Sequence, residues 1–191
     1  MKFLGIASAL LIVFLVLPVA GFAQIDNFGK LDTVYADIAR IDDNNWSITI
    51  SYFNDEVVEG LSVPLKMTAG VNRIVADSAV YTGGRVDNFT LKAFRPDTAI
   101  QCVTLGMVAN LGPTKNSLPP GTGRLVTVFV SSLEDKAIEK LTVDTTTTHP
   151  NNSLMVVANR SVWGEHSLDT ITVEKRKELE IRPHFLVRQA K

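Results

Sequence analysis

The sequence predicts an all-β protein: a two-sheet antiparallel β-sandwich with jelly-roll topology and about nine strands. Beyond the N-terminal segment, apolar residues recur at every second position far more often than with the helical period of 3.6. These alternating runs are short, return roughly every 8–12 residues and are separated by turn residues. Only two stretches have the composition of a helix. The three observations together favour a sandwich over any helical or mixed fold.

The run Trp46–Tyr52 shows the strand pattern most clearly. Its even-numbered residues are Trp, Ile, Ile and Tyr, and its odd-numbered residues are Ser and Thr. Since successive side chains of a strand point to opposite faces, we expect one buried face that includes Trp46. Asp42–Asn45 supplies turn residues, so a first strand at Thr33–Ile41 should form a hairpin with this one.

The run Gly60–Met67 alternates in the same way. Its odd-numbered residues are apolar and should face inward, while Ser62, Pro64 and Lys66 should face outward. Proline has no amide hydrogen to give to a ladder, so we expect this strand to lie at an edge or to carry a bulge at Pro64.

The other expected elements follow from shorter patterns of the same kind. Further strands are expected at Asn72–Val80, Phe89–Phe94, Ala99–Val108, Leu125–Ser131, Leu141–Thr145, Ser153–Ala158 and Thr170–Val173. The two possible helices, Ser132–Lys140 and Glu174–Ile181, are each short enough to be a loop with a single turn.

The N-terminus has the layout of a secretory signal peptide. Lys2 precedes an apolar run, and the small residues Gly21 and Ala23 follow. An uncleaved anchor is the alternative, because the uncharged run is about long enough to cross a bilayer. We expect cleavage after Ala23, since Pro18 and the small residues break the helix. The prediction is a secreted, periplasmic or cell-surface protein without a membrane span after cleavage.

The domain organisation follows from these segments. We assign 1–23 to the signal peptide, 24–31 to a short linker, 32–173 to one β-sandwich domain and 174–191 to a basic, solvated C-terminal tail.

The 19 Lys and Arg residues nearly balance the 20 Asp and Glu residues, which gives no reason to expect a nucleic-acid partner. With Cys102 alone, no internal disulfide is possible.

No pattern of catalytic or metal-ligating residues stands out. The three histidines are far apart in sequence, and no serine has the flanks of a nucleophile elbow. Asp42–Asn45 does not continue as an EF-hand loop, so it is interpreted as a hairpin turn, with a weak calcium site as the alternative. We therefore predict no enzyme activity, no cofactor and no metal site.

The glycines in Leu118–Val130, LPPGTGRLVTVFV, raise the question of a phosphate-binding loop. Such a loop requires G-x-x-x-x-G-K-[ST] followed by a helix. Here Gly121 and Gly123 precede a β-branched and aromatic run. We interpret them as a turn that leads into a core strand.

Three segments, taken in order, resemble the cohesin-type β-sandwich of secreted and surface-attached bacterial proteins. They are Val58–Leu65, Ile100–Leu111 and Leu118–Phe129, of which the last is similar to the family's P-x-G-x-G-x-L-x-T strand entry. The resemblance spans about residues 32–143. It implies a non-enzymatic module for adhesion or scaffolding, with a dockerin-like module or a surface component as its protein partner.

The resemblance also implies where a partner binds. The family uses one face of a sheet, which would here include outward residues of Leu61–Met67 and Phe89–Phe94, namely Ser62, Lys66, Thr90 and Lys92. Carbohydrate-binding modules share the fold. The alternative function is therefore polysaccharide recognition through exposed aromatic residues, for which Trp163 and Tyr81 are the candidates.

Overall fold

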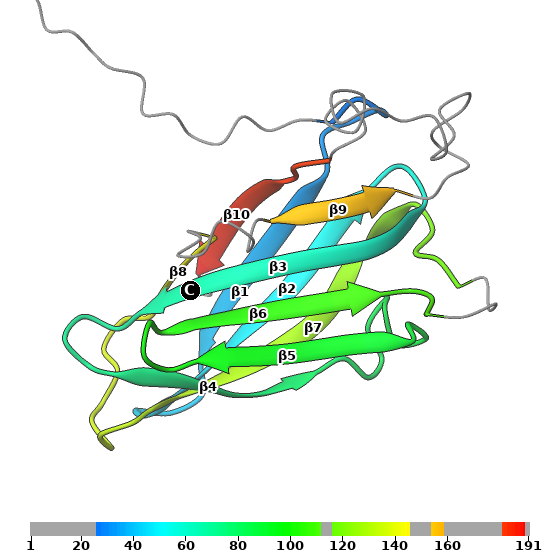
Figure 1. Ribbon diagram of the computed structural model, residues 1–191. Helices are drawn as coiled ribbons and strands as arrows, with labels where there is room; N and C mark the ends of the chain where they lie inside the picture. The colour runs from blue at the N-terminus through cyan, green and yellow to red at the C-terminus, as the bar shows by residue number, and fades with distance from the viewer. Residues whose placement is uncertain (1–25, 112–115, 146–153, 159–180, 190–191) are drawn as a thin grey trace, which may run out of the picture.

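The computed structural model describes residues 26–111, 116–145, 154–158 and 181–189. These residues form ten strands and no helix, arranged as two sheets packed face to face (Figure 1). The predicted two-sheet β-sandwich is therefore confirmed. The jelly-roll topology stays a prediction. None of the described residues form a helix with the length and apolarity needed to cross a membrane.

The first sheet has the order β10-β1-β2-β7-β4. Its strands are β10 (His184–Gln189), β1 (Thr33–Arg40), β2 (Asn45–Asn54), β7 (Gly121–Ser132) and β4 (Ile74–Val80). All neighbouring pairs are antiparallel except β1 and β10, which are parallel. The expected β1–β2 hairpin is present.

The second sheet has the order β5-β6-β3-β8, and β9 also pairs with β3. Its strands are β5 (Leu91–Asp97), β6 (Cys102–Val108), β3 (Val58–Thr68), β8 (Thr142–Asp144) and β9 (Met155–Ala158). All of these pairs are antiparallel.

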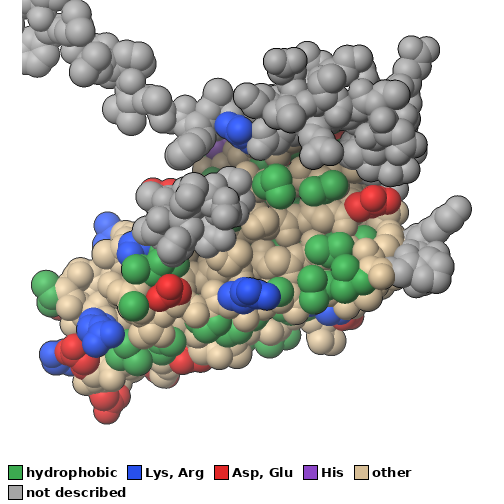
Figure 2. All heavy atoms as spheres, viewed as in Figure 1, with side chains coloured by type: hydrophobic (Ala, Val, Ile, Leu, Met, Phe, Trp, Pro, Cys, Tyr) green, Lys and Arg blue, Asp and Glu red, His purple; other side chains and the backbone are tan. Residues whose placement is uncertain are grey.

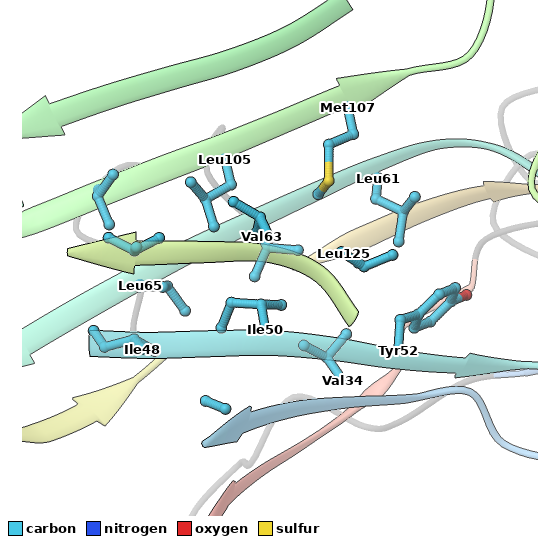
Figure 3. Close-up of a cluster of buried hydrophobic side chains, with 14 of the residues drawn as sticks. Val34, Ile48, Ile50, Tyr52, Leu61, Val63, Leu65, Leu105, Met107 and Leu125 are labelled. Atoms are coloured by element: carbon cyan, nitrogen blue, oxygen red, sulfur yellow. The ribbon is translucent and has the colours of Figure 1, made fainter. Parts of the chain in front are cut away.

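The core lies between the two sheets and follows the predicted alternation. Ile48 and Ile50 of β2 point toward Leu61, Val63 and Leu65 of β3 (Figure 3), and each is almost completely buried. Burying one such side chain contributes about 1.5–3 kcal/mol. Trp46 is partly buried and packs against the same core, as expected.

Pro64 occupies a local interruption of the second sheet. β3 is an interior strand, so the expectation of an edge strand is wrong for the strand as a whole. On the side opposite β6, however, β9 pairs with β3 from Val58 to Ser62 and β8 pairs with it from Lys66 to Thr68. Pro64 falls in the gap between β9 and β8, where a residue without an amide hydrogen is tolerated.

The C-terminal region differs most from the prediction. Instead of a solvated tail, residues 184–189 form β10, an edge strand beside β1. Arg188 explains part of the pairing: its guanidinium makes two hydrogen bonds of 2.6 and 2.7 Å with the Asp37 carboxylate and stacks 4.3 Å above the Tyr35 ring. Because both charges are half exposed, the ion pair contributes at most about 1 kcal/mol.

Some other predicted segments have a different outcome. The predicted helix Ser132–Lys140 does not form: Ser132 ends β7, and residues 133–140 form turns and irregular chain with Ile138 buried. The signal peptide, Thr170–Val173 and most of Glu174–Ile181 lie outside the described residues. Phe28 of the predicted linker packs against the core.

The glycine pair of LPPGTG lies inside a strand rather than in a turn before it, because β7 begins at Gly121. Gly121 and Gly123 have φ values of +146° and +153°, which favour glycine. The Arg85 side chain lies across them, and its guanidinium donates to the carbonyls of Tyr52, Gly121 and Pro119. Both glycines thus serve a close approach of Arg85 to the backbone.

We expect Gly123→Ala to lower the free energy of unfolding by about 1–3 kcal/mol. An added Cβ would lie 3.0 Å from Arg85 Cδ, at a φ that L-residues rarely adopt. Gly106→Ala is the matched control, because its Cβ would meet only Ala93 Cβ at an ordinary 3.5 Å. Equal stability of the two variants in urea unfolding would contradict this explanation.

Candidate functional site

Both sheets turn a mixture of polar and apolar side chains outward. On the first sheet the polar ones include Thr49 and Thr127, whose hydroxyls lie 3.3 Å apart, and the apolar ones include Phe129, paired with Ser47, and Val80, paired with Thr127. On the second sheet, residues paired in register share a face. Its outer face combines exposed apolar side chains with small residues, and it is the face to which the sequence resemblance assigns a partner, which makes it the candidate for contact with a partner.

We define the apolar patch as the outward apolar and glycine residues of β3, β5, β6 and β9. The register places these residues on one face: Gly60, Leu91, Ala93, Gly106, Val108, Met155 and Val157. Leu91, Met155 and Val157 are 39%, 38% and 41% exposed. Figure 2 shows hydrophobic side chains over β9 and over one end of β5 and β6.

Charged and polar groups border the apolar patch. Lys66 pairs with Cys102 on one side and with Asp144 on the other, so all three face outward. The Lys66 ammonium donates to the Ile100 carbonyl, which fixes its position. Arg95 lies outward on β5, opposite Thr104. An apolar centre with a charged border is the usual composition of a protein-binding surface.

The strand register places some of the predicted binding residues on the outer face of the second sheet and others away from it. Ser62 and Lys66 lie on the outer face, paired with Gly106 and Cys102. The expectation that Lys92 shares this face is wrong: Lys92 pairs with the inward-facing Met107, and its ammonium donates to the Asp87 carbonyl. Thr90 precedes β5, and its hydroxyl donates to the Ala109 carbonyl at 2.9 Å. Lys92 faces inward because successive residues of β5 alternate between the two faces, and Leu91, the first residue of the strand, faces outward.

Of the two aromatic candidates for sugar binding, the structure describes Tyr81 alone. The Tyr81 ring packs against the core, and its hydroxyl donates to the Ala93 carbonyl at 2.8 Å. Burial raises the pKa of the Tyr81 phenol to about 12. Trp163 lies outside the described residues. The structure therefore describes one of the two rings, and that ring is partly covered.

A second feature lies where β1 begins and β2 ends. We define the acidic cluster as Asp26, Asp32, Asp55 and Glu56. Each offers one carboxylate oxygen, and these four oxygens all lie within 4.8 Å of one another. Asp26 and Asp32 come from the chain before β1, and Asp55 and Glu56 form the turn between β2 and β3.

Backbone amides hold the outer members of the acidic cluster. The Asp26 carboxylate accepts the amides of Phe28 and Asp32 at 3.0 Å each. The Asp55 carboxylate accepts the Lys30 amide at 2.8 Å. The segment predicted as a linker is thus folded around these two carboxylates, which orients them toward the inner members.

The inner members are deeply buried and incompletely hydrogen-bonded. Asp32 is 0% exposed; one of its oxygens accepts the Tyr52 hydroxyl, and Oδ1 has no hydrogen-bond partner. Glu56 is 6% exposed, and neither of its carboxylate oxygens has a partner. Buried acceptors of this kind are rare, because each forfeits its hydration.

Burial also shifts the acid–base properties of these groups. Loss of hydration, together with the neighbouring carboxylates, raises the pKa of Asp32 to about 8 and that of Glu56 to about 7. The Tyr52 hydrogen bond opposes this rise at Asp32. Burial, followed by the charge of Asp32, raises the pKa of the Tyr52 phenol above its usual range.

Sequence reasoning predicts no metal site and does not find the acidic cluster. Its members are separated by up to 30 positions and follow no spacing motif. The only local signal is Asn54-Asp55-Glu56 at the end of an alternating run, which is also an ordinary turn composition. Asp42, which the sequence offers as an alternative ligand, accepts the amides of Asn44 and Asn45 at 2.8 Å and caps the hairpin turn.

No family model matches the sequence, and a search of curated proteins finds no match either. Solved structures do match. One is a type I cohesin–dockerin complex, Coh-OlpA-Doc918, from Clostridium thermocellum, with a TM-score of 0.53 and 8% identity over 84% of this chain and 100% of that chain. Another is Coh-OlpC-Doc435 from the same organism, with a TM-score of 0.51 and 6% identity over 87% and 94%.

These similarities establish the fold. The chain has a cohesin-type β-sandwich, as the sequence resemblance predicts. Identities of 6–8% carry no information about individual site residues. The functional interpretation therefore depends on the chemistry of the apolar patch and the acidic cluster themselves.

The raised carboxyl pKa values predict an unusual pH dependence in buffer free of divalent cations. Between about pH 4 and 8 the folded protein holds protons that the unfolded chain has released, so the free energy of unfolding falls as pH rises. We expect a loss of at least about 1 kcal/mol between pH 5 and pH 8.

Urea unfolding of the wild type and of Asp32→Asn measures this effect. The variant should flatten the slope because its amide stays neutral, whereas Glu139→Gln at an exposed position should leave the slope unchanged. Stability that is constant or rises over this pH range would show that the acidic cluster does not titrate in this way.

Proposed function

We propose that this chain is an exported, non-enzymatic module that binds a protein partner through the outer face of the β5-β6-β3-β8 sheet. The apolar patch is the observation that carries the proposal. It joins four strands on one face and exposes the side chains of Leu91, Met155 and Val157.

The geometry of the patch favours a folded partner over a small ligand. Gly106 has no side chain and is only partly buried, so a partner backbone or helix can approach the sheet closely there, whereas Gly60 is buried beneath Val157. Leu91 and Met155 would supply apolar anchors, and a few such anchors dominate the energy of most interfaces. Lys66, Asp144 and Arg95 at the border would determine orientation and association rate.

The fold supports the same class of partner. The two similar structures are cohesin–dockerin complexes, and their cohesin modules act in them as protein-binding domains. By analogy, a dockerin-like module or another surface component is the partner that we propose for this chain. Export rests on the N-terminal signal-peptide pattern, which places the proposed encounter in the periplasm, at the cell surface or in the medium.

Polysaccharide binding is the alternative that shares this fold. It requires aromatic rings with a free face, and Tyr81 is held at its hydroxyl and packed against the core. The alternative thus depends on Trp163. Retention on polysaccharide that is lost in Trp163→Ala, with no protein captured, would favour it over the present proposal.

Substitution at the apolar patch tests the proposal. We expect Val157→Glu to weaken partner binding at least about tenfold, because it places a charge in the apolar centre of the interface. The measurement is capture of secreted and surface proteins on immobilised mature chain, followed by titration of the captured partner with each variant.

Val80→Glu is the matched control. Val80 has a similar exposure, 42% against 41%, but pairs with Thr127 on the other sheet. Circular dichroism and thermal unfolding verify that both variants fold. Lys66→Glu should also weaken binding, whereas Lys92→Glu should have little effect. Equal loss from Val80→Glu and Val157→Glu would show that the binding surface lies elsewhere.

A further inference from the structure

The acidic cluster brings four carboxylates together at one end of the sandwich, on side chains that the proposed binding face does not use. Among the described residues, no ion pair links these carboxylates to a lysine or arginine. Arg85 is nearby, but its hydrogen bonds are with backbone carbonyls. Within this part of the chain, no lysine or arginine therefore neutralises the acidic cluster through a direct ion pair.

Buried acceptors without a donor at the inner members indicate a missing proton or cation. Asp32 Oδ1 and both Glu56 oxygens are buried and have no hydrogen-bond partner. The adjacent Asn54 Oδ1 is also buried and without a partner, while its amide nitrogen donates to the carbonyls of Glu56 and Pro119. A cation bound between the carboxylates would satisfy the orphaned acceptors of Asp32 and Glu56.

We propose that Asp26, Asp32, Asp55 and Glu56 form a calcium-binding site that ties the N-terminal segment to the β2–β3 turn. The donor set consists of hard, anionic oxygens without histidine or cysteine, which suits Ca²⁺ rather than zinc or copper. Four carboxylates also offer enough oxygens for the six to eight ligands that calcium takes, with water completing the shell.

The spacing of the oxygens is compatible with calcium. Ca²⁺–O distances of about 2.3–2.6 Å allow ligand oxygens to lie up to about 5.2 Å apart, and the four oxygens of the acidic cluster lie within 4.8 Å of one another. Magnesium requires near-ideal octahedral geometry and gives up its water reluctantly, so a site built from four carboxylates suits calcium better.

The surrounding backbone holds the ligands in place. Gly29 lies against Asp55, and a Cβ at this position would be 2.4 Å from Asp55 Oδ2. The amides of Phe28, Lys30 and Asp32 fix the Asp26 and Asp55 carboxylates, as outer hydrogen bonds commonly orient metal ligands. The hydrogen bond from the Lys30 amide to Asp55 thereby connects the segment before β1 to the turn after β2.

Calorimetric titration of the chelator-treated mature chain with calcium chloride tests the proposal. We expect saturable binding, a melting temperature several degrees higher in calcium than in chelator, and a smaller rise in magnesium. Terbium provides a second probe, because Tyr52 contacts Asp32 and should sensitise its luminescence. Calcium should displace the terbium.

Two variants separate ligand loss from loss of folding. Glu56→Gln should weaken calcium binding at least about tenfold and yet be no less stable than the wild type in chelator, since it removes a buried negative charge. Gly29→Ala should weaken binding without changing the charge. Glu139→Gln, an exposed acidic position, should bind calcium as the wild type does.

The proposal is overturned by an absence of saturable calcium binding together with identical melting temperatures in calcium and chelator. Calcium affinity of Glu56→Gln equal to that of the wild type would also overturn it. A magnesium effect as large as that of calcium would contradict the assignment of the ion. None of these results depends on the proposed partner-binding face, whose variants leave the acidic cluster intact.

Discussion

Apolar side chains at every second position of β2 and β3 are the constraint on which the rest of this structure depends. Because the two strands lie in different sheets, their inward faces meet and form one core (Figure 3). The same alternation sends every other residue outward and thereby decides what each sheet offers to solvent. On β2 these residues are largely serine and threonine; on the second sheet they include the apolar patch. The proposed function thus follows from which residues the core leaves outside.

The acidic cluster is the point where this regularity ends. Tyr52 belongs to the inward face of β2, but its hydroxyl reaches Asp32 at the end of the sandwich, and Glu56 is buried beside it. Burying ionisable groups without satisfying them costs free energy, so the arrangement requires a compensating interaction. Protonation supplies one below the raised pKa values of about 7 and 8, and a bound cation would supply another. The two are coupled, since a cation requires the carboxylates to lose their protons.

The sequence predicts the strands well because their signal is local. The Trp46–Tyr52 and Gly60–Met67 runs carry their own inward and outward assignment, and β2 and β3 form there as expected. The sequence assigns Lys92 to the wrong face because the start of β5 at Leu91 determines which residues face inward, and no local pattern marks that start. It does not indicate β10 because the pairing of this strand depends on Tyr35 and Asp37, far away in the chain. The acidic cluster escapes sequence reasoning for the same reason: only the fold brings residues 26 and 56 together.

Native-state hydrogen exchange tests most directly the claim that a single core unites both sheets. If β2 and β7 close on β3 and β6 as one unit, their slowest amides exchange only through global unfolding, with one common free energy that equals the value from urea unfolding. β10, an edge strand with exposed side chains, should exchange faster. Two groups of amides with distinct free energies, divided between the first and the second sheet, would contradict the account, because the sheets would then be stable independently of the shared core.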